Sequence, residues 1–140
     1  MTRLSILVAD DSPEVCSLLT IWLGDHQVVS VYSGTEALAA TALLHFDLVV
    51  TDVHMPDVSG LEVIRRLKQN QPTVRILAIS GGSRYVSSSD CVTAAKKAGA
   101  DAAILKPFNE ELLLNAVREA LAPTTVQALP NAFTGVVVAH

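Results

Sequence analysis

The chain has 140 residues, half of them hydrophobic, with a formal net charge of −4 and a pI near 5.4. This length is enough for one globular domain with a sizeable core and leaves no room for a second. The acidic balance, with lysine and arginine scattered along the chain, argues against direct nucleic-acid binding, and no apolar stretch is long enough to span a membrane.

The cysteines and the N-terminus favour a cytoplasmic protein. Cys16 and Cys91 lie far apart on different predicted helices, and neither has a CxxC or metal-spaced partner. This usage is typical of reduced thiols rather than of a disulfide framework. The N-terminal apolar run is too short, and too soon followed by acidic residues, to be a signal peptide. We therefore expect a cytoplasmic monomer or weak dimer with no membrane or nucleic-acid partner.

The hydrophobic pattern predicts five strands that alternate with five helices. Short, nearly continuous apolar runs indicate buried parallel strands, and serine or asparagine caps mark where helices begin. In chain order the predicted elements are strand 4–9, helix 13–23, strand 27–32, helix 34–44, strand 47–52, helix 60–69, strand 75–80, helix 90–98, strand 102–105 and helix 109–121. Such alternation predicts a doubly wound five-stranded parallel sheet with helices on both faces.

Four of these strands end on polar residues that suit phosphoryl chemistry. The residues are Asp10 and Asp11 after the first strand, Asp52 after the third, Ser80 after the fourth and Lys106 after the fifth. Ligands of such sheets bind beyond the carboxyl ends of the strands, so we expect these side chains to meet at one edge. Taken alone, Asp10 and Asp11 before Pro13 are also typical of a simple helix cap.

The predicted cluster favours an aspartate nucleophile with a divalent cation. Asp52 lies at the end of the central strand, and aspartate is known to form aspartyl-phosphate intermediates. Three close carboxylates repel one another unless a cation lies between them, and Mg²⁺ is usually held by one or two carboxylates together with waters and phosphoryl oxygens. Lys106 adds a positive charge, and Ser80 adds a hydrogen-bond donor for a phosphoryl oxygen.

In these motifs the chain resembles the receiver domains of two-component response regulators. The resemblance covers about residues 3 to 121 and rests on five elements in register: the first strand, its acidic pair Asp10-Asp11, residues 52–60, Ser80-Gly81 and Lys106-Pro107-Phe108. It implies a flavodoxin-like fold with strand order 2-1-3-4-5. It also implies that Asp52 takes a phosphoryl group from a histidine kinase or a phosphotransfer protein, and that the domain catalyses its own Mg²⁺-dependent phosphorylation and dephosphorylation.

The resemblance also assigns roles to single residues. Asp11, Asp52 and the backbone carbonyl of His54 would ligate Mg²⁺, with Asp10 acting directly or through water. Lys106 would contact the acyl phosphate and Ser80 would move to report it, while the bond before Pro107 would be cis. The His54 side chain is expected to face solvent, although its position two after Asp52 is where this family tunes the lifetime of the phosphoryl group.

Three functions remain open at this stage. The leading hypothesis is a phosphoacceptor switch, a phosphoprotein of a two-component phosphorelay, that changes its binding to a partner. The second is the receiver fragment of a larger transcription regulator; the apolar C-terminal residues 136–139 favour a complete small protein instead. The third is an aspartate-nucleophile phosphatase, but such enzymes usually have a second aspartate where this chain has His54.

Two segments depart from the regular alternation. Residues 81–89 are rich in glycine and serine and make the stretch from Ser80 to Lys106 longer than in ordinary receivers, which predicts a mobile loop. The family commonly has tyrosine or phenylalanine where this chain has Ala103, so we expect loop 81–89 and the helix after it to report phosphorylation. With the receiver domain at 1–122, residues 123–140 are expected to form a flexible or docking tail.

Overall fold

The computed structural model of the protein describes residues 2–81 and 88–123. Within these ranges the strands and helices alternate as the sequence predicted, and each boundary lies within two residues of its predicted position. In chain order the elements are β1 (Ser5–Ala9), α1 (Pro13–Trp22), β2 (Gln27–Val31), α2 (Gly34–Leu43), β3 (Leu48–Asp52), α3 (Gly60–Asn70), β4 (Arg75–Ser80), α4 (Ser88–Ala98), β5 (Ala102–Leu105) and α5 (Glu110–Leu121).

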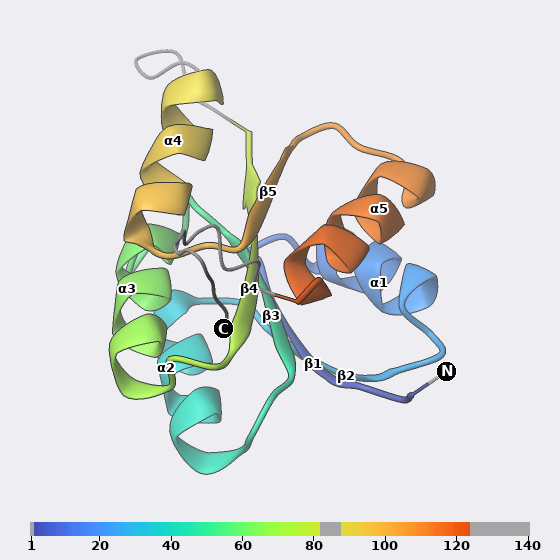
Figure 1. The fold of residues 1–140 in the computed structure, drawn as a ribbon, viewed down its shortest axis with the longest axis horizontal. Coiled ribbons are helices and arrows are strands. Elements are labelled where there is room, and N and C mark those ends of the chain that lie inside the picture. Colours follow the sequence, from blue (N-terminus) through green and yellow to red (C-terminus); the bar gives the residue numbers. More distant parts are fainter. Residues whose placement is uncertain (1, 82–87, 124–140) are drawn as a thin grey trace, which may run out of the picture.

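The five strands form one parallel sheet in the order β2-β1-β3-β4-β5. Helices α1 and α5 cover one face, and α2, α3 and α4 cover the other (Figure 1). This is the flavodoxin-like, doubly wound arrangement that the sequence predicted. Because the strand order reverses direction next to β1 and β3, the carboxyl ends of these two strands border the crevice where ligands of such sheets bind.

The central strands are buried on both faces, which explains why their sequences are continuous apolar runs. Alternate residues of β3 enter different clusters: Leu48 and Val50 pack towards α1 and α5, whereas Val49 packs towards α2, α3 and α4. Side chains of a strand point alternately to opposite faces, so a strand between two helical layers needs apolar residues at successive positions. The two hydrophobic clusters, one on each face of the sheet, together fix the position of the strands and of their carboxyl ends.

Side-chain caps set the starts of four helices. The side chains of Ser12, Ser33, Ser59 and Asn109 each accept a hydrogen bond from the backbone N–H three residues later. Each cap satisfies an amide that the helix itself leaves unpaired, and together they confirm the predicted start signals. None of the helices in the described part of the chain has the length and apolar character that crossing a bilayer requires.

Two predictions fall partly or wholly outside the described residues. The first concerns the loop 81–89, of which residues 82–87 are not described, and the second concerns the tail, which is described only to Pro123. Helix α4 begins at Ser88, two residues before its predicted start.

Candidate functional site

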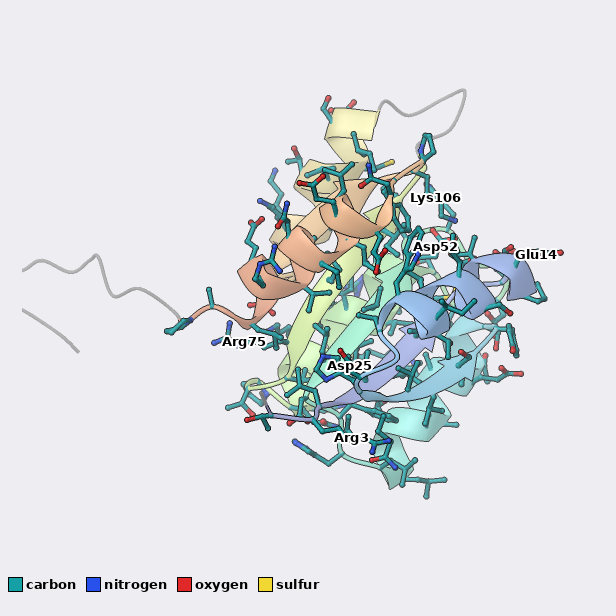
Figure 2. All side chains as sticks on the ribbon, turned by 90° about the vertical axis from the view of Figure 1, so that its right-hand side faces the viewer. Arg3, Glu14, Asp25, Asp52, Arg75 and Lys106 are labelled. Atoms are coloured by element: carbon teal, nitrogen blue, oxygen red, sulfur yellow. The ribbon has the colours of Figure 1, made fainter. Side chains whose placement is uncertain are left out.

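The fold gathers the predicted site residues at the carboxyl edge of the sheet. Asp10 follows β1, Asp52 ends β3, Ser80 ends β4, and Lys106 follows β5. Figure 2 shows Asp52 and Lys106 close together at one end of the sheet, while Arg3 and Arg75 lie towards the other end. Asp10, Asp52 and Ser80 are all buried, and burial is unusual for the two carboxylates among them.

Lys106 lies between two buried carboxylates. Its Nζ is 3.0 Å from Asp10 Oδ2 and 3.3 Å from Asp52 Oδ2. The other oxygens of these carboxylates are held by backbone amides, because Ser12 N–H donates to Asp10 Oδ1 and His54 N–H donates to Asp52 Oδ1. One ammonium therefore faces two negative charges, and the net charge of the pocket is negative before the neighbouring Asp11 is included.

The acidic cluster has the donor set that a hard divalent cation needs. Asp10, Asp11 and Asp52 each offer a carboxylate oxygen, and these oxygens all lie within 4.8 Å of one another. Within the described part of the chain, Asp10 Oδ2 is buried and accepts no well-directed hydrogen bond, although Lys106 lies close to it. A buried carboxylate oxygen with unused acceptor capacity fits a cation ligand, and oxygen donors are those that Mg²⁺ prefers.

The titration behaviour of the cluster follows from burial and charge. Burial and then the charge of Asp10 raise the pKa of Asp52, and the hydrogen bond from His54 together with Lys106 offsets only part of this rise. Burial lowers the pKa of Lys106, but its close contact with Asp10 and the charge of Asp52 outweigh burial, so the pKa of Lys106 is raised. The raised pKa of Lys106 thus reflects the two carboxylates beside it, whereas that of Asp52 reflects burial first and the charge of Asp10 second.

The loop after β3 approaches the strand end so closely that one position requires glycine. A Cβ atom on Gly60 would lie 1.9 Å from the backbone oxygen of Asp52, and Gly60 N–H donates to the carbonyl of Val53 at 2.9 Å. Any larger residue would push α3 away from the loop. The glycine of the 52–60 motif is therefore needed for packing rather than for a left-handed conformation.

Asp57 ties the same loop to the beginning of α2, which the sequence did not predict. Its two carboxylate oxygens accept hydrogen bonds from the backbone N–H groups of Gly34 and Thr35, each at 3.0 Å. The Thr35 hydroxyl, then the backbone N–H of Val58, and then these two bonds hold the pKa of Asp57 well below its usual range. An anion at a helix N-terminus is a familiar arrangement, but only the fold brings residues 23 positions apart together.

Three further features of the site concern the residues Lys106, Ser80 and His54. The Lys106-Pro107 peptide bond is cis, which confirms the predicted isomer. Ser80 is fully buried, and its carbonyl accepts a hydrogen bond from Lys106 N–H, so the ends of β4 and β5 are held together. His54 is exposed as predicted, but its Nε2 also lies 3.7 Å from Cys91 Sγ in α4, a contact that no sequence motif indicates.

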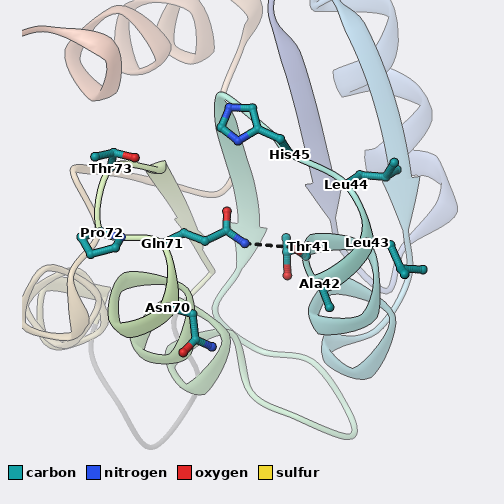
Figure 3. Close-up of a pocket in the computed structure, with 9 residues that line it drawn as sticks. All are labelled: Thr41, Ala42, Leu43, Leu44, His45, Asn70, Gln71, Pro72 and Thr73. Carbon is teal, nitrogen blue, oxygen red and sulfur yellow. Dashed lines mark hydrogen bonds between the residues drawn. The ribbon is translucent and has the colours of Figure 1, made fainter.

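A pocket also lies at the opposite edge of the sheet, away from Asp52 and Lys106. It has a volume of about 510 Å³ and lies between the ends of α2 and α3, lined by residues 41–45 and 70–73 (Figure 3). Gln71 Nε2 donates to the carbonyl of Thr41 across it at 2.9 Å, and no carboxylate lines it. Its size alone does not make this pocket the candidate functional site, because Asp10, Asp52, Ser80 and Lys106 all lie at the other edge.

Comparison with known proteins places this arrangement in a family. The model of the response regulator receiver domain matches residues 6–118, and the chain belongs to that family. The transcriptional regulatory protein ZraR of Salmonella typhimurium is 34% identical over 134 residues, which cover 93% of this chain and 30% of ZraR. The chain thus spans less than a third of the length of this relative.

Solved structures agree with the family. The BeF3-activated receiver domain of DrrB from Thermotoga maritima superimposes with a TM-score of 0.75 at 30% identity, covering 86% of this chain and 98% of that one. The chemotaxis response regulator CheY4 of Vibrio cholerae gives a TM-score of 0.77 at 28% identity, covering 86% of this chain and all of that one. The family and fold expected from the sequence motifs are therefore confirmed.

Proposed function

We propose that this protein accepts a phosphoryl group on Asp52 and changes its binding to a partner as a result. The observation that carries the proposal is the buried pair Asp10 and Asp52, which share one ammonium, that of Lys106, at the carboxyl edge of a receiver fold. A fold that needed only stability would not place two carboxylates there, because buried like charges repel and cost desolvation energy.

Asp10, Asp11, Asp52 and the backbone carbonyl of His54 are the groups that would hold Mg²⁺. The buried oxygen Asp10 Oδ2, which accepts no well-directed hydrogen bond, and the closeness of the three carboxylates support this assignment. Bound there, the ion would neutralise charge on the phosphoryl oxygens and orient the group for transfer.

In the proposed transfer an oxygen of Asp52 forms a bond to phosphorus as the bond between phosphorus and the donor's imidazole nitrogen breaks. The electron pair of that bond stays on the imidazole, and the product is an acyl phosphate on Asp52. Lys106 would interact with the phosphoryl oxygens, since it already faces both carboxylates. Ser80 would donate its hydroxyl to another phosphoryl oxygen, and water held at the same site would later hydrolyse the acyl phosphate.

A histidine kinase or a histidine phosphotransfer protein is the proposed donor. An apolar groove of about 250 Å³ runs beside the site, lined by Val15 and Leu18 of α1 and by Lys106, Pro107 and Phe108. Ile21, one turn further along α1, is 71% exposed. An apolar surface next to the reacting carboxylate suits a helical partner that must bring its histidine to Asp52.

The two free cysteines support a cytoplasmic setting for this exchange.

A second candidate is that the chain is the receiver part of a longer transcription regulator. Its similarity to ZraR supports this, because the match covers only 30% of that protein. In that case phosphorylation of Asp52 would control an attached output domain rather than a separate partner. Intact-mass measurement of the native protein distinguishes the two, since a mass well above 14.8 kDa would favour the longer regulator.

The phosphoacceptor proposal is tested with acetyl phosphate and Mg²⁺. We expect mass spectrometry to find one added phosphoryl group, which hydroxylamine removes because it is an acyl phosphate. Asp52→Asn should abolish the addition, whereas the matched control Asp25→Asn, at an exposed loop position, should label like the unmodified protein. Equal labelling of Asp52→Asn would overturn the assignment.

A further inference from the structure

Helix α4 contacts the loop after β3 through a cysteine and a histidine. Cys91 Sγ lies 3.7 Å from His54 Nε2, a distance at which either the thiol or the ring N–H can donate a weak hydrogen bond. Cys91 is only 4% exposed, and Ala95, one turn further along α4, is fully buried. These residues belong to the inward face of α4, and the exposed His54 side chain contacts α4 at the margin of this face.

The backbone of His54 is hydrogen-bonded to the carboxylate of Asp52, the proposed phosphoacceptor. His54 N–H donates to Asp52 Oδ1 at 3.2 Å, and the carboxylate is buried. Three groups are therefore joined in series: the carboxylate of Asp52, the peptide and ring of His54, and the thiol of Cys91. A phosphoryl group bonded to Oδ1 would change the first of these contacts, and a shift of the His54 peptide would carry the ring with it.

Position 103 of β5 offers no bulky side chain for the same purpose. Position 103 of β5 is an alanine that is partly buried against the cluster formed with α2, α3 and α4. A methyl group cannot turn between an inward and an outward position as a ring can. The contact between His54 and Cys91 supplies a different connection between the site and α4.

We propose that the His54–Cys91 contact is the link through which the state of Asp52 is passed to α4. This inference rests on the proposed function. When a phosphoryl group occupies Asp52, Oδ1 no longer accepts from His54 N–H in the same geometry, the peptide shifts, and the ring withdraws from Cys91. The inward face of α4 at Cys91 then becomes accessible, and the helix presents a different surface to a partner.

The rate at which iodoacetamide alkylates Cys91 measures this change directly. Mg²⁺ with beryllofluoride provides the stand-in for the phosphoryl group, and ¹⁹F NMR shows whether the protein has bound it. We expect Cys91 to react about fivefold faster or more in the bound state, which corresponds to about 1 kcal/mol of easier local opening. Cys16 is the internal reference, because it is fully buried and burial raises its pKa to about 11.

Two variants separate the link from general loosening. His54→Ala should raise the reactivity of Cys91 without any ligand and remove most of the response to beryllofluoride. The matched control His45→Ala removes an exposed histidine at the other edge of the sheet and should change neither rate.

The outcomes also separate the two proposals. Bound beryllofluoride with an unchanged Cys91 rate would overturn the link and leave the phosphoacceptor proposal standing. Equal Cys91 rates in His54→Ala and His45→Ala without ligand would overturn the link as well. If neither beryllofluoride nor the phosphoryl group of acetyl phosphate is taken up, the proposed function fails and the link fails with it.

Discussion

The two edges of the β-sheet differ in how their charged residues are paired. At the amino edge, Lys68 Nζ is 3.0 Å from Asp101 Oδ2 and donates to the carbonyl of Val74, while the same aspartate oxygen accepts from Ile76 N–H. Lys68 and Asp101 therefore each have a partner of opposite sign and a further hydrogen bond to the backbone. At the carboxyl edge, Asp10, Asp11 and Asp52 lie close to one another, and the ammonium of Lys106 contacts both Asp10 and Asp52.

This difference is the one expected if the amino edge stabilises the fold and the carboxyl edge binds a ligand. A charge that is paired and hydrogen-bonded repays the cost of removing it from water, whereas excess charge of one sign does not. Substitutions at the amino edge should therefore lower stability, and some at the carboxyl edge should raise it. The following substitutions test that contrast.

The largest stability effect is expected at Asp101. Asp101→Ala leaves the ammonium of Lys68 without its partner and the amide of Ile76 without its acceptor, and both side chains of the ion pair are less than a third exposed. We expect the free energy of unfolding to fall by about 2 kcal/mol in urea denaturation. Asp25→Ala, at an exposed position, is the control and should change it by less than about 0.5 kcal/mol.

Removal of Asp11 should weaken cation binding rather than the fold. Asp11 is exposed and supplies one of the three carboxylates of the cluster. We expect Asp11→Ala to raise the Kd for Mg²⁺ in calorimetry about tenfold, or about 1.4 kcal/mol. Glu14→Ala removes the same charge from the first turn of α1 and serves as the control. Equal Mg²⁺ affinity in the two variants would contradict the metal role of Asp11.

The sequence predicts the position of this site better than it predicts the contacts around it. Asp52 and Lys106 end apolar runs, and parallel strands bring their carboxyl ends to one edge, so their proximity follows from the strand order. The contact of Cys91 with His54 depends on how α4 packs over the loop, and the bond from Asp57 to α2 depends on the meeting of two segments. Neither has a local signal, because helical and strand periodicities describe faces and not distances between elements.

Asp52→Asn should stabilise the protein without Mg²⁺. Burial and the charge of Asp10 raise the pKa of Asp52, so the folded protein holds this proton more tightly than the unfolded chain does. The stability that protonated Asp52 contributes to the fold is present at low pH and is lost as the pH rises through the pKa of Asp52 in the folded protein. At neutral pH the variant should melt a few degrees higher, and the gain should shrink as the pH falls. An unchanged or lower Tm at pH 7 would show that Lys106 already balances the charge.

The smallest effect is expected at Lys106, and it has two parts of opposite sign. The ammonium stabilises the two buried carboxylates, so Lys106→Gln should lower the Tm slightly when no cation is present. The same ammonium competes with a cation for those oxygens, so the variant should bind Mg²⁺ about two- to threefold more tightly, in line with the modest energy of a partly exposed ion pair. Lys97→Gln, on the exposed side of α4, controls for the loss of one positive charge. Weaker Mg²⁺ binding by Lys106→Gln would mean that the lysine positions the carboxylates for the cation instead of competing with it. The carboxylates would then depend on the ammonium for the geometry that binds Mg²⁺, and their mutual repulsion would not be what favours the cation.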